Sequence, residues 1–162
     1  MEEYIKKVKV LPVVILLVFL FASFGIAAER KFHARLTGGE IVGQVHTTAH
    51  GDADFQISVG GDQLTYKLTV KNIKNVSATH IHQGKHGENG PPVVSLFSGP
   101  KKAGEFNGVL SEGTITAKDL IGPLKGKPLS SLTQIIEDKN AYVNVHTDKY
   151  PDGEIRGQIR YK

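Results

Sequence analysis

Apolar and polar residues alternate along most of the chain after residue 30, and this period of two predicts a series of short β-strands. The alternation is clearest in residues 54–59 and 63–70, which flank a Gly-Gly-Asp sequence at residues 60–62 that is typical of a hairpin turn. Residues 72–76 are interpreted as a connection. The other expected strands are residues 31–37, 93–97, 106–115, 141–146 and 154–161. Short strands separated by turn residues predict an all-β fold, an antiparallel Greek-key sandwich or barrel.

One short segment has the periodicity of a helix. Leu132, Ile135 and Ile136 are spaced to share one face of that helix, and Ser130 or Ser131 is expected to cap its first turn. The fold is therefore expected to carry one short helix in a connection between strands.

The N-terminal segment has the pattern of a targeting signal. Lysines precede a long apolar run that ends in small residues, with Gly25 and Ala27 placed for cleavage after Ala27. Residues 1–28 are predicted to be a signal peptide. The apolar run is also near the length of a membrane-spanning helix, so residues 10–26 are alternatively an uncleaved N-terminal membrane anchor. In both cases the folded domain, residues 30–162, is expected to function in a secreted, extracellular or periplasm-like location.

Composition restricts the chemistry that this domain can perform. The sequence has no cysteine and its single methionine is Met1, so neither disulfides nor thiolate metal sites are available. A bound metal ion would have imidazole and oxygen ligands, which suit Cu(II) and Zn(II). The formal net charge is only +4, and no basic stripe with interleaved aromatic residues occurs, so nucleic-acid binding is not expected.

Two histidines separated by one residue are the first candidates for a functional site. In an extended strand His80 and His82 project from one face, while Ile81 projects from the other. Their Cα atoms are then about 6.5–7 Å apart, and both imidazoles can reach one metal ion at about 2.0–2.1 Å. A histidine pair alone is a weak indication, so a metal site requires a third ligand.

His146 is the expected third ligand. Val143 and Val145 occupy alternate positions of its predicted strand and should face the core, which places His146 on the other face, next to a turn. His86, in the glycine-rich segment after the histidine pair, is a candidate additional ligand. Glu154 is a candidate hydrogen-bond acceptor for a ligand imidazole. The alternative is a solvated surface position for each histidine and a turn-stabilising role for Glu154.

Several longer motifs resemble the chordin-type (CHRD) domain. The matching segments are residues 64–70 (LTYKLTV), 78–82 (ATHIH), 87–94 with its glycines and prolines, and 141–158, which contains AYVNVHT and PDGEIRGQ. The similarity covers nearly all of residues 32–162, and the last motif is the longest and most specific. The family occurs in exported microbial proteins and as repeats in chordin, an extracellular antagonist of growth factors. The resemblance therefore implies a fold and an extracellular setting more than a biochemical function.

A more distant resemblance is to the copper half of copper/zinc superoxide dismutase. The motifs that carry it are the His-x-His pair and residues 143–146 (VNVH) and 153–157 (GEIRG). By position, this resemblance implies copper ligation by His80, His82 and His146. It also implies an anion-guiding role for Arg156, for which the alternative is an ion pair on the strand face. Pro92 stands where that family has a bridging histidine, and the zinc loop and disulfide cysteines are missing. What remains is a mononuclear site on a superoxide-dismutase-like or immunoglobulin-like sandwich.

Three functions follow from these observations. The favoured one is an exported domain that binds a single metal ion, copper in preference to zinc, and carries, buffers or senses it. The alternative is a non-enzymatic extracellular structural or protein-interaction module whose histidines are incidental. A mononuclear copper enzyme resembling superoxide dismutase is less favoured, so the protein is expected not to be an enzyme. The expected partners are the metal ion or an extracellular protein, and membrane contact would involve only the N-terminal segment. Metal affinity should fall below about pH 6, where imidazoles are protonated.

Overall fold

The structure is a computed structural model that describes residues 30–162. The signal peptide predicted for residues 1–28 and the alternative anchor at residues 10–26 lie outside the described residues. Residues 30–162 contain no helix with the length and apolar character needed to cross a membrane.

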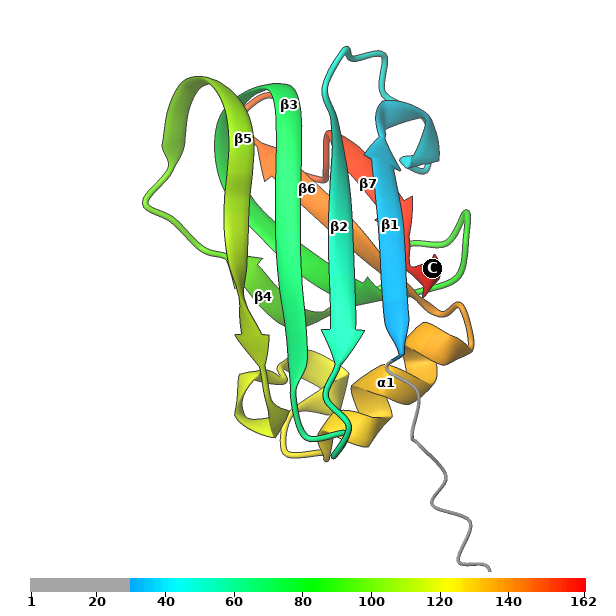
Figure 1. The fold of residues 1–162 in the computed structure, drawn as a ribbon. Coiled ribbons are helices and arrows are strands. Elements are labelled where there is room, and N and C mark those ends of the chain that lie inside the picture. Colours follow the sequence, from blue (N-terminus) through cyan, green and yellow to red (C-terminus); the bar gives the residue numbers. More distant parts are fainter. Residues whose placement is uncertain (1–29) are drawn as a thin grey trace, which may run out of the picture.

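The fold is an antiparallel β-barrel with one short helix, which confirms the predicted fold class (Figure 1). The strands are β1 (Lys31–Thr37), β2 (His50–Ile57), β3 (Leu64–Gln83), β4 (Pro92–Phe97), β5 (Lys102–Ile115), β6 (Ala141–Thr147), β7 (Ile155–Gln158) and β8 (Arg160–Tyr161). The barrel consists of five strands in the spatial order β1–β2–β3–β6–β7, each paired with its neighbour. It closes because β7 also pairs with β1. Strands β4 and β5 pair with β3, and β8 pairs with β1.

The long strand β3 connects the two sides of the barrel. Its first part pairs with β2 and β5, and its last part pairs with β6 and β4. Between these parts, Asn72 and Asn75 have φ angles of 54° and 53°, a left-handed conformation that asparagine tolerates better than most residues. The interpretation of residues 72–76 as a connection was therefore wrong. The strand continues through two irregularities, and Ile73 and Val76 remain fully buried along it.

The core fills the barrel with alternate residues of its strands. Phe32, Leu36 and Leu68 are fully buried in this core. Val143 and Val145 of β6 are also fully buried and belong to it, as predicted.

The helix α1 (Leu129–Glu137) lies between β5 and β6 in sequence and packs at one end of the barrel (Figure 1). Leu132 and Ile136 are buried, as expected from their spacing. The predicted serine cap was wrong, because the helix begins at Leu129 and has Pro128 at the N-cap position without a side-chain hydrogen bond. Both serines therefore lie inside the first turn.

Candidate metal centre

The pairing of β3 with β6 brings the three histidines to one face of the sheet. Directly opposite residues of an antiparallel pair project from the same face. His80 lies opposite Asn144, and His146 lies opposite Ala78. His80, His82 and His146 therefore share the outer face of the barrel, opposite to the face that forms the core.

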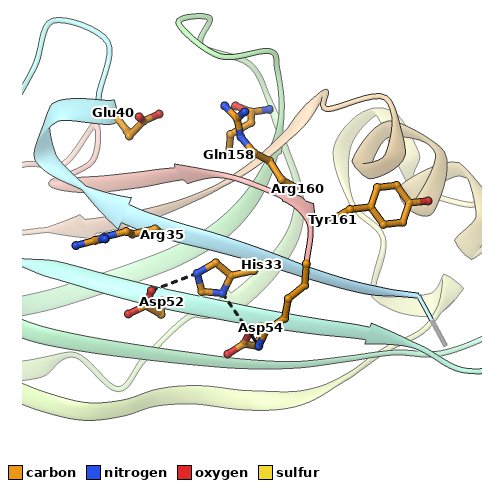
Figure 2. Close-up of a pocket in the computed structure, with 9 residues that line it drawn as sticks. His33, Arg35, Glu40, Asp52, Asp54, Gln158, Arg160 and Tyr161 are labelled. Carbon is orange, nitrogen blue, oxygen red and sulfur yellow. Dashed lines mark hydrogen bonds and ion pairs between the residues drawn. The ribbon is translucent and has the colours of Figure 1, made fainter.

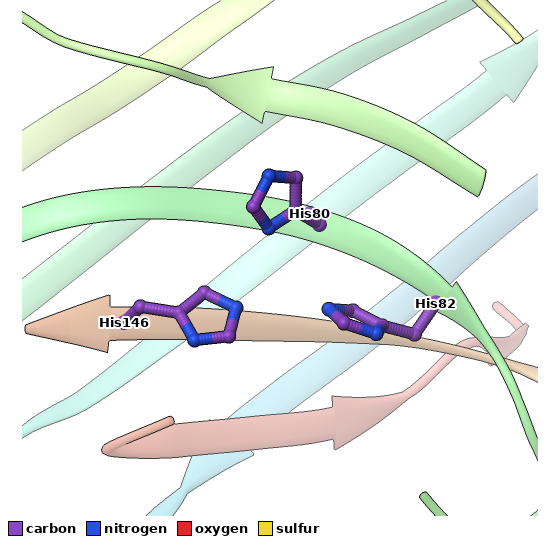
Figure 3. A group of neighbouring side chains, drawn as sticks. All are labelled: His80, His82 and His146. Carbon is purple, nitrogen blue, oxygen red and sulfur yellow. The ribbon is translucent and has the colours of Figure 1, made fainter. Parts of the chain in front are cut away.

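The three imidazole rings surround a common space (Figure 3). The ring centroids are 5.7 Å apart for His80 and His82, 5.3 Å for His80 and His146, and 5.8 Å for His82 and His146. One nitrogen atom from each ring lies within 4.8 Å of the other two. Three such atoms lie within about 2.8 Å of a common point, so shifts of less than about 1 Å would bring them to the distance of about 2.0–2.1 Å for a metal–imidazole bond.

Backbone carbonyls hold two of the rings in a defined orientation. The Nδ1 atom of His82 donates a hydrogen bond of 2.8 Å to the carbonyl oxygen of Gly90, and Nδ1 of His146 donates one of 2.8 Å to that of Pro151. The Nε2 atoms of both histidines are buried and have no hydrogen-bond partner among the described residues. This arrangement fits a metal ligand, because a histidine that binds a metal through one nitrogen commonly donates the other N–H to a carbonyl or carboxylate.

The same burial keeps the imidazoles neutral. Burial lowers the pKa of His80 to about 4, with further contributions from the neighbouring His146 and His82. Burial also lowers the pKa of His82 and of His146, and in each case outweighs the opposing effect of the hydrogen bond to a backbone carbonyl. At neutral pH all three rings therefore carry a free lone pair, which is the form that binds a metal ion.

His86 and Glu154 lie outside this group of three. The His86 side chain is 63% exposed and its Nε2 atom lies 3.2 Å from a carboxylate oxygen of Glu40, so the structure does not place it as an additional ligand. The Glu154 carboxylate accepts hydrogen bonds from the hydroxyls of Thr47 (2.7 Å) and Thr147 (2.8 Å). It does not orient a ligand imidazole, because backbone carbonyls occupy that position at His82 and His146.

The position of Arg156 fits neither the anion-guiding role nor the strand-face ion pair expected for it. Its side chain is among the largest that are fully buried, so it does not present a guanidinium to an anion arriving from solvent. No carboxylate among the described residues forms an ion pair with it. Instead, the guanidinium donates to the carbonyl oxygen of Lys85 (2.8 Å) and to the side chain of Asn89 (3.4 Å), and lies 3.5 Å from the ring centroid of Tyr142. Burial lowers its pKa.

Sequence reasoning missed Tyr142 as part of the site. Its ring stacks on that of His82, with centroids 5.1 Å apart and an interplanar angle of 13°. The alternation along β6 placed Tyr142 on the same face as His146, and this was the available signal. The sequence did not indicate that a loop would cover that face and bury the tyrosine.

A separate hollow lies beside β1 and β2 (Figure 2). Its volume is about 640 Å³. The ring of His33 lies in it between Asp52 (3.3 Å) and Asp54 (3.1 Å), and none of the three clustered histidines lines it. The two ring nitrogens of His33 are therefore already paired with carboxylates.

Comparison with known proteins identifies the family. A search of curated proteins and a search of solved structures each found no match. A family model described as the CHRD domain matches residues 32–159, which include all three clustered histidines and nearly the whole described barrel. The chain therefore belongs to the CHRD-domain family.

Proposed function

We propose that this CHRD domain binds a single metal ion through His80, His82 and His146. The observation that carries the proposal is the convergence of three imidazole nitrogens within 4.8 Å of one another. It is supported by the two buried Nε2 atoms that lack a partner among the described residues, since buried polar atoms are normally hydrogen-bonded. A metal ion bound between the rings would satisfy both atoms.

Copper is the proposed ion, with zinc as the alternative. Divalent copper binds nitrogen ligands more tightly than the other first-row divalent metals, including zinc. The absence of cysteine and of any methionine beyond Met1 removes the sulfur ligands that would favour Cu(I). Three imidazoles also leave a coordination position for water or for a ligand from another molecule.

The proposed role is the carriage, buffering or sensing of this ion outside the cytoplasm. The proposal of export rests on the lysine-then-apolar pattern of residues 1–28. A carrier or buffer requires only reversible binding of the ion. A superoxide-dismutase-like enzyme would also use an exposed cation to guide its anionic substrate, but Arg156 is buried. This favours binding over superoxide turnover.

Metal titration tests the proposal directly. The purified protein is titrated with Cu(II) and Zn(II) by calorimetry, and the copper form is studied by electron paramagnetic resonance. We expect one ion per chain, nitrogen hyperfine structure, and a large loss of affinity in His80→Ala, His82→Ala and His146→Ala. His86→Ala is the matched control and should bind as the wild type does, because His86 is exposed and pairs with Glu40.

Two results would point to the other functions. No binding, together with a melting temperature that metal leaves unchanged, would contradict the proposal and favour a structural or protein-interaction module. Superoxide turnover by the copper-loaded protein that His80→Ala abolishes would instead indicate an enzyme.

A further inference from the structure

A buried arginine that forms no direct ion pair among residues 30–162 lies beside the candidate metal centre. Burying a charged group is costly unless hydrogen bonds compensate it. Arg156 is 1% exposed. Burial lowers its pKa and the carboxylates of Glu40 and Glu88 act to raise it, but neither carboxylate is close enough to form an ion pair with it among residues 30–162. The hydrogen bonds and ring contact of its guanidinium group are therefore the interactions that offset the free-energy cost of burying this charge.

Those contacts hold the segment that follows β3, residues 84–90. Arg156 donates to the carbonyl oxygen of Lys85 (2.8 Å) and to the side chain of Asn89 (3.4 Å). Gln158, two residues further along β7, donates from its amide to the carbonyl oxygen of Gly84 (2.9 Å). Two side chains of one strand thus fasten this loop over the outer face of the barrel.

Tyr142 connects the arginine to the same loop. The guanidinium lies 3.5 Å from the centroid of the tyrosine ring, which is a cation–π arrangement. The backbone N–H of Gly90 donates a hydrogen bond of 3.1 Å to the Tyr142 hydroxyl. Position 90 has no room for a side chain, because a Cβ atom there would lie 1.7 Å from the carbonyl oxygen of Gln83.

Gly90 in turn orients His82. Its carbonyl oxygen accepts the hydrogen bond from Nδ1 of His82, which leaves Nε2 of that ring for the metal ion. The ring itself stacks on Tyr142. A continuous set of contacts therefore runs from Arg156 through Tyr142 and Gly90 to His82.

We propose that Arg156 and Tyr142 are positioning residues for the metal centre. They hold residues 84–90 against β6 and β7, and thereby fix the tautomer and orientation of His82. This inference rests on the proposed metal-binding function. The orientation of His146 should not depend on them, because its acceptor is Pro151, in the turn between β6 and β7.

The test uses the full chain with Tyr142→Phe and Arg156→Met. Tyr142→Phe keeps the stacked ring and removes the hydroxyl that accepts from Gly90. Arg156→Met removes both hydrogen bonds to the loop. Arg160→Met is the matched control, because Arg160 is an exposed arginine on the neighbouring strand β8.

Nitrogen-15 NMR of the metal-free protein reports the histidine tautomers without any metal. In the wild type and in Arg160→Met we expect His82 to be protonated at Nδ1. In the two test variants we expect a mixture of tautomers at His82, with the signals of His146 unchanged. In the same variants Cu(II) affinity should fall by about 10–100-fold, the usual effect of removing an outer partner of a metal ligand.

The outcomes separate positioning from simple destabilisation. The inference is overturned if Tyr142→Phe keeps the Nδ1 tautomer of His82, keeps Cu(II) affinity within twofold of the wild type, or disturbs His146 as much as His82. If Arg156→Met does not fold, Tyr142→Phe alone decides. If the wild type binds neither Cu(II) nor Zn(II), the proposed function fails, while the NMR comparison still decides whether these residues orient His82.

Discussion

The imidazole rings of His80 and His146 lie 5.3 Å apart, centroid to centroid, although they come from distant parts of the chain. The distance follows from the antiparallel pairing of β3 with β6, in which His146 is opposite Ala78 and therefore diagonal to His80. A shift of this register by one residue would place His146 on the opposite face of the sheet from His80 and His82. The geometry of the candidate metal centre therefore depends on the register between β3 and β6.

Metal affinity should persist to lower pH than free imidazoles would allow. The folded-state pKa values of the three histidines all lie below the ordinary value of 6.5, and that of His80 is about 4. Protons therefore compete for these rings only at lower pH, which revises the expected loss near pH 6. We expect a smaller loss of Cu(II) affinity between about pH 7 and pH 6 than free imidazoles would give, and a further loss as the pH falls toward the His80 pKa of about 4, measured by competition with a chelator of known affinity.

Two results would contradict this expectation. A large loss of affinity between about pH 7 and pH 6 would mean that the rings titrate as free imidazoles do. Unchanged affinity at a pH well below the His80 pKa of about 4 would mean that carboxylates, rather than histidines, bind the ion.

The metal-free protein should lose stability as the pH falls from 6.5 toward 4. The pKa of His80 is 6.5 in the unfolded chain and about 4 in the folded protein. Between these values the unfolded state binds more protons, so the free energy of unfolding decreases with falling pH. Above 6.5 the ring is neutral in both states and has no such effect.

Urea unfolding of the chelator-treated protein at several pH values measures this decrease. His80→Gln has no titrating ring at this position, so its stability should depend less on pH over the same interval. Equal pH dependence in the variant and the wild type would show that His80 does not contribute to the effect.

Gly153→Ala should be destabilising for two physical reasons. Gly153 has a φ angle of +127°, and a Cβ atom there would lie 2.2 Å from the side chain of Asn144. Backbone strain of this kind costs about 1–3 kcal/mol, and the overlap with Asn144 adds to it. Because the turn also carries Pro151, the acceptor for His146, we expect reduced metal affinity in addition to a lower free energy of unfolding.

Gly126→Ala is the control that measures the cost of backbone strain without steric overlap. Gly126 also has a positive φ angle, +77°, but no atom lies within 4 Å of an added Cβ. Its substitution should cost less than that of Gly153 and should leave metal affinity unchanged. An equal loss of unfolding free energy at the two positions would contradict the expected steric overlap with Asn144.

Leu132→Ala should destabilise the fold without a direct effect on the histidines. Leu132 is fully buried where α1 packs on the barrel, and truncation of a buried leucine costs about 2–5 kcal/mol. Val59→Ala is the control, because Val59 is 73% exposed and should change stability by less than about 0.5 kcal/mol. Chemical denaturation measures both, and a Leu132→Ala cost below 1 kcal/mol would contradict the assigned packing.

The local pattern of the chain was sufficient for much of the fold. Alternation predicted the strands that contain Val143 and Val145, and their burial follows from the period of two in an extended chain. The same period placed His80 and His82 on one face of β3. Helical spacing identified Leu132 and Ile136 as the buried residues of α1.

Only the tertiary structure decided what the outer face of the barrel contains. Periodicity states which residues share a face, but it does not state which strand will pair with it or whether a loop will cover it. The pairing of β3 with β6 brings His146 beside His80, and the loop at residues 84–90 buries Tyr142 and Arg156. Burial then lowers the histidine pKa values, because desolvation disfavours the charged ring. The sequence alone determined the candidate ligands, and long-range packing determined their geometry and protonation, since these depend on neighbours that are distant in the chain.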